Sequence, residues 1–356
     1  MGQGPRATVV KSVLPDSAEL DALFAPARHS RALLLAVSGG PDSMALLRLA
    51  AFWRDAGGAP PLHVATVDHG LRTEARAEAG QVAAAAAAVG LPHRLLVWQG
   101  VKPAARLQEA AREARYRLLA AHAEECGADM LMLAHHRDDQ AETVLFRLLR
   151  GSGVDGLGSM RMLVRVGPLT LFRPFLDWPK ARLVEICSAL GQDFVDDPSN
   201  RDPRFARSGL RALAPSLAAQ GLDAAALARL AGRAARASDA LAGRAQTVAL
   251  SLARPGEAGA QEWLDATPLR AEPEEIVLRV LGILLASAAG DGLRATRLRL
   301  DRLEQLTGKV IRALRDAAPL AATLAGARIT LNAKGHLKLR PEGSRTRGLG
   351  AARRAR

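Results

Sequence analysis

The sequence contains few aromatic residues and few cysteines. Aromatic side chains make up 3% of the 356 residues, so an extensive surface of base-stacking rings is not expected. The two cysteines, Cys126 and Cys187, are far apart and form no paired motif, which leaves too few ligands for a zinc or iron–sulfur centre. We therefore expect two buried, reduced thiols in a cytoplasmic protein.

Long apolar runs are also missing. A helix needs about 20 consecutive apolar residues to cross a bilayer, and no stretch of the chain reaches that length. The N-terminal residues Met1–Val10 lack the apolar segment of a secretory signal. The sequence therefore predicts a cytoplasmic protein with no membrane partner.

Positive charge is present in excess. The formal net charge is +13, and arginine supplies most of the positive side. Arginine side chains pair with phosphates and release counterions from nucleic acid, so a polyanionic partner is one interpretation. A genome with biased base composition also gives chains rich in Ala and Arg, and charge alone does not decide between the two.

Short apolar runs alternate with helical periodicity in the first half of the chain. Strands are expected at residues 31–37, 62–67, 93–98 and 130–134, and helices at 42–53, 74–89, 107–125 and 140–149. This alternation predicts an α/β fold, in which helices cover both faces of a parallel sheet. Ligands of such sheets bind beyond the carboxyl ends of the strands.

The later part of the chain has a different residue pattern. Short strands are expected at 162–166 and 169–172, and a helix at 179–190. From about residue 217 the pattern becomes rich in Ala and Leu and all-helical, and near the end apolar residues alternate around Gly335 as in a β-hairpin. We therefore expect four parts: a domain at 1–216, a helical domain at 217–325, a hairpin at 326–342 and a basic, disordered tail at 343–356.

The segment Gly151–Gly158 contains a literal G-x-G-x-x-G. A dinucleotide-binding fingerprint has to leave a strand and open a helix, whereas this segment leaves an expected helix. A mobile loop over the site is the better interpretation.

The turn after the first expected strand has the sequence S-G-G-P-D-S, from Ser38 to Ser43. Its two glycines let the backbone approach an anion closely, and its proline suits a first helical turn. The free N–H groups and the helix dipole then face a phosphate. A plain Gly-rich turn is the alternative, but the whole hexapeptide after a buried strand favours a phosphate loop. The G-x-x-x-x-G-K-[ST] motif of P-loop kinases is absent.

Two more polar motifs follow expected strands. In V-D-H-G-L-R, Asp68 and His69 stand at a strand end, where they either meet a nucleotide or, for Asp68, cap the following turn. The fourth strand leads into H-H-R-D-D-Q-A-E-T, residues 135–143, which combines two imidazoles and three carboxylates at helical spacing. Such a cluster can hold Mg²⁺ or order a cationic amine, whereas simple helix capping needs only one carboxylate.

The phosphate loop resembles the pyrophosphate loop of the ATP pyrophosphatases. Together with V-D-H-G-L-R and H-H-x-D-D-Q-x-E-T at these distances, it resembles the tRNA(Ile)-lysidine synthetases within that superfamily. Segments at residues 107–116, 173–176 and 196–200 also match, so the resemblance covers about residues 32–211. One departure is Ser208, which stands where the family usually carries Asn.

The resemblance implies an adenine nucleotide alpha hydrolase-like fold and a two-step reaction. ATP adenylates the carbon-2 oxygen of the wobble cytidine in an isoleucine tRNA with a CAU anticodon, and pyrophosphate leaves. The ε-amine of free lysine then attacks carbon 2, and AMP leaves. The product, lysidine, changes the codon and amino-acid specificity of the tRNA.

The resemblance also implies roles for individual residues. The ATP-binding residues are expected to be Ser38, Gly39, Gly40, Pro41, Asp42, Ser43, Asp68 and His69. The catalytic residues are expected to be Asp42, Arg112, Arg115, His135, Asp138, Asp139 and Glu142. Mg²⁺ is expected at Asp42 and Asp138, and tRNA at Arg201, Arg204, Arg207 and Arg211.

Several alternatives stay open at this stage. The sequence does not choose which carboxylate deprotonates lysine, and Arg112 and Arg115 are either a phosphate clamp or solvated surface arginines. The expected partners are free lysine and the anticodon loop and stem of the tRNA, the stem being held by the helical domain and basic tail. The oligomeric state is undecided, with a homodimer as one option.

Two other functions compete with this interpretation. One is a thiolase of the same superfamily, which would usually carry C-x-x-C pairs that are missing here. The other is a nucleotide-binding regulator without chemistry, for which the cluster of carboxylates and histidines would be out of place.

Overall fold

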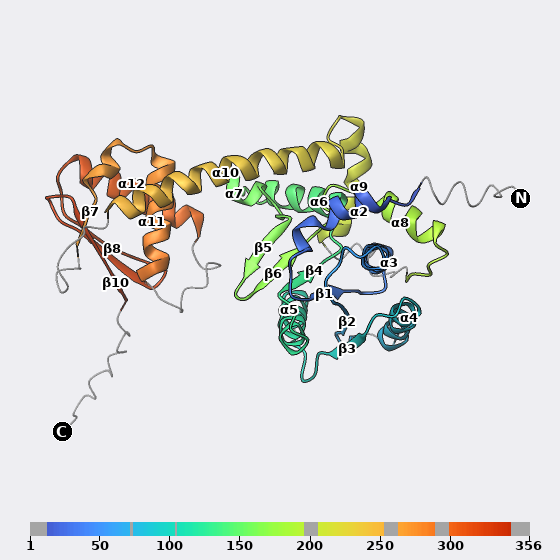
Figure 1. The fold of residues 1–356 in the computed structure, drawn as a ribbon. Helices are drawn as coiled ribbons and strands as arrows, with labels where there is room; N and C mark the ends of the chain where they lie inside the picture. Colours follow the sequence, from blue (N-terminus) through green and yellow to red (C-terminus); the bar gives the residue numbers. More distant parts are fainter. Residues whose placement is uncertain are drawn as a thin grey trace, which may run out of the picture. The chain divides into compact units, whose positions relative to one another are not determined.

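Six strands form the central sheet of the computed structural model, in the order β3-β2-β1-β4-β6-β5 (Figure 1). The structure describes residues 13–71, 74–103, 105–195, 206–252, 263–288 and 299–342. The strands are β1 (Leu33–Ala36), β2 (Leu62–Asp68), β3 (His93–Val97), β4 (Met130–Met132), β5 (Leu163–Val166) and β6 (Leu169–Phe172). All neighbouring pairs are parallel except β5 and β6, which confirms the expected α/β class.

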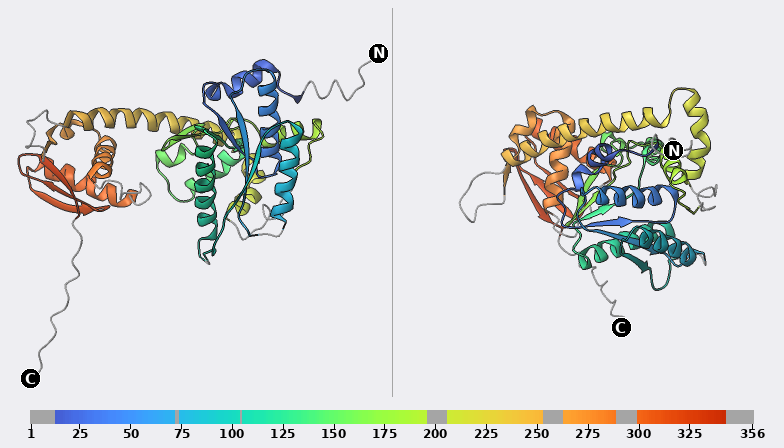
Figure 2. Two further views of the ribbon diagram at one scale, coloured as in Figure 1. Left: turned by 60° about the horizontal axis from the view of Figure 1, so that its bottom comes forward. Right: turned by 45° about the vertical axis from the view of Figure 1, so that its right-hand side comes forward.

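The apolar runs that predicted the strands are buried on both sides of the sheet. Along β1, Leu33 and Leu35 belong to one core and Leu34 to the other, because successive side chains of a strand point to opposite faces. Helices α3 (Pro41–Asp55), α4 (Ala75–Ala88) and α8 (Lys180–Ala189) contribute to the first core, and α5 (Leu107–Glu125) to the second. Figure 2 shows α5 on one side of the sheet and α3 and α4 on the other. This two-sided burial explains the nearly continuous apolar strands.

The order of the strands places the site. Strand β1 lies between β2 and β4, so the chain leaves β1 towards one side of the sheet and later returns on the other. In open α/β sheets the crevice at such a switch point is the usual ligand site. The phosphate loop follows β1 and the H-H-R-D-D motif follows β4, so the two motifs come together at this point.

Five further helices precede β1, lie between β4 and β5, or follow α8 in the sequence. They are α2 (Ser17–Phe24), α6 (Arg137–Leu148), α7 (Val154–Leu157), α9 (Ala206–Ala219) and α10 (Ala224–Leu252). The Gly-rich segment 151–158 does not line the site as expected: it forms the short helix α7, and the Arg147 guanidinium donates a hydrogen bond to the Gly156 carbonyl at 2.5 Å.

The chain divides into two compact units, residues 1–235 and 236–356, and the division falls within α10. The first unit therefore extends past the boundary expected at residue 216. The reason is that Leu227 and Ala231 of α10 are buried against Ala141 and Val144 of α6. No helix in the described part of the chain is both long and apolar enough for a bilayer.

The second unit contains a four-stranded antiparallel sheet in the order β7-β10-β9-β8. Its elements are β7 (Leu264–Asp265), α11 (Glu274–Ala288), α12 (Leu300–Arg315), β8 (Leu320–Leu324), β9 (Ala327–Leu331) and β10 (His336–Pro341). The expected hairpin is the β9–β10 pair, but two further strands flank it within the region expected to be all-helical. Strand β7 has only two residues and β8 is rich in alanine, so neither gives a strong strand pattern.

Candidate functional site

A cavity of about 1640 Å³ opens at the carboxyl ends of β1, β2 and β4, entirely within the first unit. The phosphate loop after β1 and the polar residues that open α6 line it. Further walls come from α5, α8 and α9. Motifs that lie about 100 residues apart in the sequence therefore face one space.

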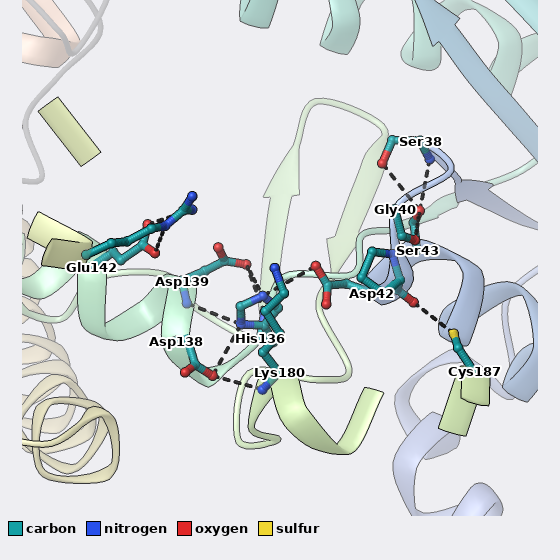
Figure 3. Close-up of polar contacts among 12 residues, drawn as sticks. Ser38, Gly40, Asp42, Ser43, His136, Asp138, Asp139, Glu142, Lys180 and Cys187 are labelled. Atoms are coloured by element: carbon teal, nitrogen blue, oxygen red, sulfur yellow. Dashed lines mark hydrogen bonds and ion pairs between the residues drawn. The ribbon is translucent and has the colours of Figure 1, made fainter. Parts of the chain in front are cut away.

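The phosphate loop is held in shape by its two serines. The Ser43 hydroxyl accepts a hydrogen bond from the Ser38 backbone N–H at 3.1 Å and donates one to the Gly40 carbonyl at 3.0 Å (Figure 3). Gly39 has φ +94°, a conformation that strongly favours glycine. Helix α3 begins directly after this turn, so its free N–H groups and positive dipole end face the cavity. This geometry suits a bound phosphate.

His136 lies at the centre of a cluster of three carboxylates (Figure 3). Its Nε2 lies 3.5 Å from Oδ2 of Asp42 and 3.5 Å from Oδ2 of Asp139. Its Nδ1 lies 3.6 Å from Oδ2 of Asp138. His136 is buried, whereas Asp42 and Asp138 are partly exposed. The ring thus connects the phosphate loop to the first turn of α6.

His136 also caps α6. Its Nδ1 accepts a hydrogen bond from the Asp139 backbone N–H at 3.3 Å, and the Asp139 carboxylate accepts one from the His136 backbone N–H at 3.2 Å. This reciprocal pair is a capping box. Because Nδ1 acts as the acceptor, the proton of the neutral ring sits on Nε2, between Asp42 and Asp139.

The surroundings of His136 and Asp139 raise the pKa of both side chains. Burial lowers the pKa of His136, but the hydrogen bond to Asp42 and the surrounding carboxylates outweigh it, so the net pKa is raised. Burial raises the pKa of Asp139, and His136 opposes this shift only in part. The raised pKa makes the His136 ring easier to protonate than a free imidazole, and the raised pKa of Asp139 makes it a better proton acceptor than an ordinary aspartate.

His136 was missed as a candidate, since His135 was chosen from the same dipeptide. Both line the cavity, but His136 is the one that contacts Asp42, Asp138 and Asp139. A strand-to-helix turn places adjacent residues on different sides, and the sequence does not say which of the two faces the acids. Lys180 was also missed: it lines the cavity, and its backbone N–H donates to Oδ2 of Asp138 at 2.9 Å.

Glu142 binds an arginine from a distant helix. The Arg211 guanidinium of α9 donates two hydrogen bonds to it, from Nε to Oε1 at 2.5 Å and from the Nη2 nitrogen to Oε2 at 3.2 Å. The hydrogen bonds that Arg211 donates to Glu142 raise the pKa of Arg211. Arg211 was expected to bind tRNA, and the structure places it in the cavity wall against Glu142. The other three expected tRNA ligands, Arg201, Arg204 and Arg207, lie outside the residues or side chains that the structure describes.

Arg112 and Arg115 line the cavity from α5 and flank the only tyrosine of the chain. Their guanidinium carbons lie 5.1 and 5.9 Å from the centre of the Tyr116 ring. Arg173 is buried nearby, and its guanidinium donates to the Arg161 carbonyl at 2.8 Å. Burial lowers the pKa of Arg173, while Tyr116 opposes that shift. A basic wall thus faces the phosphate loop.

In the V-D-H-G-L-R motif, Asp68 caps the following turn and His69 lines the cavity. The Asp68 carboxylate accepts a hydrogen bond from the Gly70 backbone N–H at 2.7 Å, so it caps the turn, and it is buried. His69 lines the cavity and lies edge-on to the Trp98 ring at 6.2 Å. His69 is therefore the member of this pair that lines the cavity.

Of the two expected Mg²⁺ ligands, Asp42 fits a magnesium ion better than Asp138 does. Oδ1 of Asp42 is buried without a hydrogen-bond partner, although a carboxylate oxygen in that position needs a cation or a donor. Asp138 accepts from Lys180 and lies on the opposite ring nitrogen of His136. Among the described residues, no three His, Cys, Asp or Glu side chains group as a metal site. Mg²⁺ usually needs only one or two carboxylates together with water and phosphate oxygens, so Asp42 satisfies that requirement.

Both cysteines are free, but only one of them is buried. Cys126 is partly exposed, which differs from the expectation of two buried thiols. The Cys187 thiol lies under the phosphate loop and donates to the Pro41 carbonyl at 3.3 Å. Burial, with a contribution from the Asp42 charge, raises the pKa of Cys187 to about 11.

This difference predicts selective alkylation. Near the ordinary thiol pKa of about 8.5, iodoacetamide should modify the native protein at Cys126 and leave Cys187 intact, because only thiolates react. Peptide mass mapping should then find both sites modified after denaturation. Equal labelling of both cysteines in the native protein would contradict the burial of Cys187.

Comparisons with known proteins agree with this geometry. Residues 14–217 match the family described as the PP-loop domain. A tRNA(Ile)-lysidine synthase from Methylobacterium nodulans is 52% identical over 323 residues, which cover 89% of this chain and 92% of that protein. Another, from Bradyrhizobium sp., is 47% identical over 343 residues, 93% of this chain and 96% of that protein.

The solved structures show the same fold at low identity. A U34-tRNA thiolase from Methanococcus maripaludis superposes with a TM-score of 0.53 and 15% identity, covering 65% of this chain and 80% of that one. That thiolase has a [4Fe-4S] cluster. The likeness concerns the architecture around the sheet.

Proposed function

The chain belongs to the tRNA(Ile)-lysidine synthase family of PP-loop enzymes, and we propose how its residues form lysidine on tRNA(Ile). The family uses ATP, and so does this enzyme. One observation supports the assignment of roles: the phosphate loop and the acid cluster share one cavity, and His136 contacts both Asp42 and the carboxylates of α6.

In the first step the wobble cytidine is adenylated. The phosphates of ATP bind Ser38, Gly39, Gly40, Pro41 and Ser43, where the N-terminus of α3 offers backbone donors. The carbon-2 oxygen of the base attacks the α-phosphate, and pyrophosphate leaves. Negative charge develops on phosphate oxygens during this attack, so donors and cations fixed in advance stabilise the transition state. Arg112 and Arg115 supply such cations from the facing wall.

Asp42 holds Mg²⁺ in this proposal, with Asp138 as the second expected ligand. When bound, the ion would neutralise charge on the phosphates of ATP. Asp42 is suited to this role because Oδ1 is buried and lacks a hydrogen-bond partner. His69 borders the nucleotide from the end of β2, and Asp68 supports the turn that carries it.

In the second step free lysine attacks carbon 2, and AMP leaves. The ε-ammonium group must first lose a proton to become a nucleophile. Asp138, Asp139, Glu142 and His135 complete the set of residues that bind the amine or handle its proton. Among them we assign the base to Asp139, because burial raises its pKa and so makes it a better proton acceptor than an ordinary aspartate.

The remaining expectations complete the proposal. The anticodon loop enters the cavity, because unpaired bases leave a loop at little cost compared with a duplex. The domain at 1–216 carries the chemistry, and the helical domain at 217–325, with the tail at 343–356, binds the anticodon stem. Arg201, Arg204, Arg207 and Arg211 contact the tRNA, Arg211 after releasing Glu142. The enzyme works in the cytoplasm, as a monomer or a homodimer.

Labelled lysine tests this function directly. The purified protein, with ATP, Mg²⁺ and a tRNA(Ile) transcript, should transfer radioactive lysine into acid-precipitable RNA. Omission of ATP, chelation of Mg²⁺ with EDTA, or a uridine in place of the wobble cytidine should each reduce incorporation to background. ATP cleavage to AMP with no lysine in the RNA would instead favour another PP-loop tRNA-modifying enzyme, such as a thiolase.

A further inference from the structure

Aromatic residues of the described chain are buried or partly buried, with one exception. Trp263, at the start of β7, is the only aromatic side chain in these residues that is exposed, at 38%. The other three tryptophans lie in the first unit and are less exposed. An indole left in water in a chain with so few aromatic residues calls for an explanation.

The exposed tryptophan stands beside a row of cations. Antiparallel register pairs Lys338 with Thr330 and Arg340 with Arg328, so these side chains project from one face of the β9–β10 pair. The ammonium nitrogen of Lys338 lies 5.5 Å from the centre of the Trp263 ring, within the range of a cation–π contact. We call this surface the basic sheet face; its members are Trp263, Arg328, Lys338 and Arg340.

The opposite face of the same sheet is the core of the second unit. Ile329, Leu331 and Leu337 are buried there, where α12 packs against β8 and α11 against β10. The basic sheet face stays open: Arg328 and Arg340 are exposed, as are Ala321 and Thr323 on the neighbouring strand β8.

The positive charges on this face are not arranged for stability. Arg328 and Arg340 are directly opposite each other, and like charges in that position destabilise a sheet. Partial desolvation and the Arg340 charge lower the pKa of Lys338. A polyanion would be attracted to this concentration of positive charge.

We propose that the basic sheet face binds RNA, with its three cations on successive phosphates and an unpaired base stacked on Trp263. A flat sheet that presents cations and an aromatic ring is a common platform for single-stranded nucleic acid. The RNA is the tRNA substrate, and in this identification the inference rests on the proposed function. It adds a second contact, outside the catalytic cavity, that senses an unpaired nucleotide.

Neutral substitution of the two opposed arginines tests the phosphate contacts. Binding of the full-length protein to a tRNA(Ile) transcript is measured by filter binding over a series of KCl concentrations. R328Q/R340Q should weaken binding by about tenfold and reduce the slope of log K against log salt by roughly 1.4 to 1.8, or 0.7 to 0.9 per lost phosphate contact. The matched control is R94Q/R117Q, which removes the same charge from exposed positions on β3 and α5 that do not line the cavity.

Substitution of the tryptophan tests the stacked base. W263A should weaken tRNA binding by at least about fivefold, whereas W263F should retain most of the affinity, because phenylalanine also stacks. With a fully paired RNA duplex as the probe, W263A should bind like the wild type. Thermal unfolding should show that each variant keeps its fold, and R328Q/R340Q should be no less stable than the wild type, because it removes two opposed like charges.

Turnover separates this inference from the proposed function. At saturating tRNA the variants should keep the wild-type kcat for lysidine formation and show a raised KM. A wild-type protein that binds tRNA through this face but forms no lysidine would contradict the proposed function alone. Wild-type affinity and salt slope in R328Q/R340Q and W263A, or an equal loss in the R94Q/R117Q control, would overturn the basic sheet face as an RNA site.

Discussion

Replacing Asp42 by asparagine is expected to reduce pyrophosphate release by about 10²–10³-fold or more, the range for the loss of one preorganised electrostatic group. Asparagine preserves the shape of the side chain but removes the charge that holds Mg²⁺ and faces His136. Oδ1 of Asp42 is buried without a hydrogen-bond partner, which is the position in which a cation would lie. The measurement is tRNA-dependent exchange of labelled pyrophosphate into ATP, together with AMP formation.

The same helix provides the control. Asp55, the last residue of α3, is exposed and pairs with Arg54, away from the cavity. Asp55→Asn removes an equal charge from α3 and should leave exchange unchanged. A surface ion pair of this kind contributes about 1 kcal/mol or less, so the fold should be unaffected. Wild-type exchange by Asp42→Asn, or an equal loss in Asp55→Asn, would refute the role given to the phosphate loop.

The arrangement of the sheet could be predicted because local patterns determine it. The apolar run that became β1 has side chains in two cores, and such a run has no exposed face. The second unit was harder to predict. Its strand β8 alternates small residues with partly buried leucines, and β7 has two residues that pair only because β10 lies beside them. These strands depend on tertiary contacts, which a local pattern does not contain.

The site was predicted at the level of motifs and less well at the level of single side chains. Polar residues after β1, β2 and β4 do meet in one cavity, because parallel strands end at the same edge. The pairing of Glu142 with Arg211 joins helices that are 69 residues apart, so neither local periodicity nor spacing reveals it. Asp68 turned inward to cap its own turn, one of the two options that its sequence allowed.

His136 gives the second large effect that we expect. His136→Ala should lower the rate of lysidine formation by about 10²-fold or more, since it removes the ring between Asp42, Asp138 and Asp139 and leaves three carboxylates facing one another. It should also lower the free energy of unfolding by about 0.5–2 kcal/mol, because the N-cap of α6 is lost. The measurements are steady-state kinetics with labelled lysine and urea denaturation.

Two further variants complete this test. One distinguishes loss of the His136 ring from loss of the α6 cap, and the other compares His135 with His136. Asparagine is a favoured N-cap residue, so His136→Asn should recover most of the lost stability and remain nearly as inactive as His136→Ala. His135→Ala should lose about tenfold or less, because the ring that caps α6 and lies between Asp42, Asp138 and Asp139 is that of His136. Activity in His136→Asn close to the wild type, combined with a large loss in His135→Ala, would return the catalytic role to His135. The same result would reduce His136 to a structural cap, since the bridge between the phosphate loop and the carboxylates of α6 would then be dispensable for chemistry.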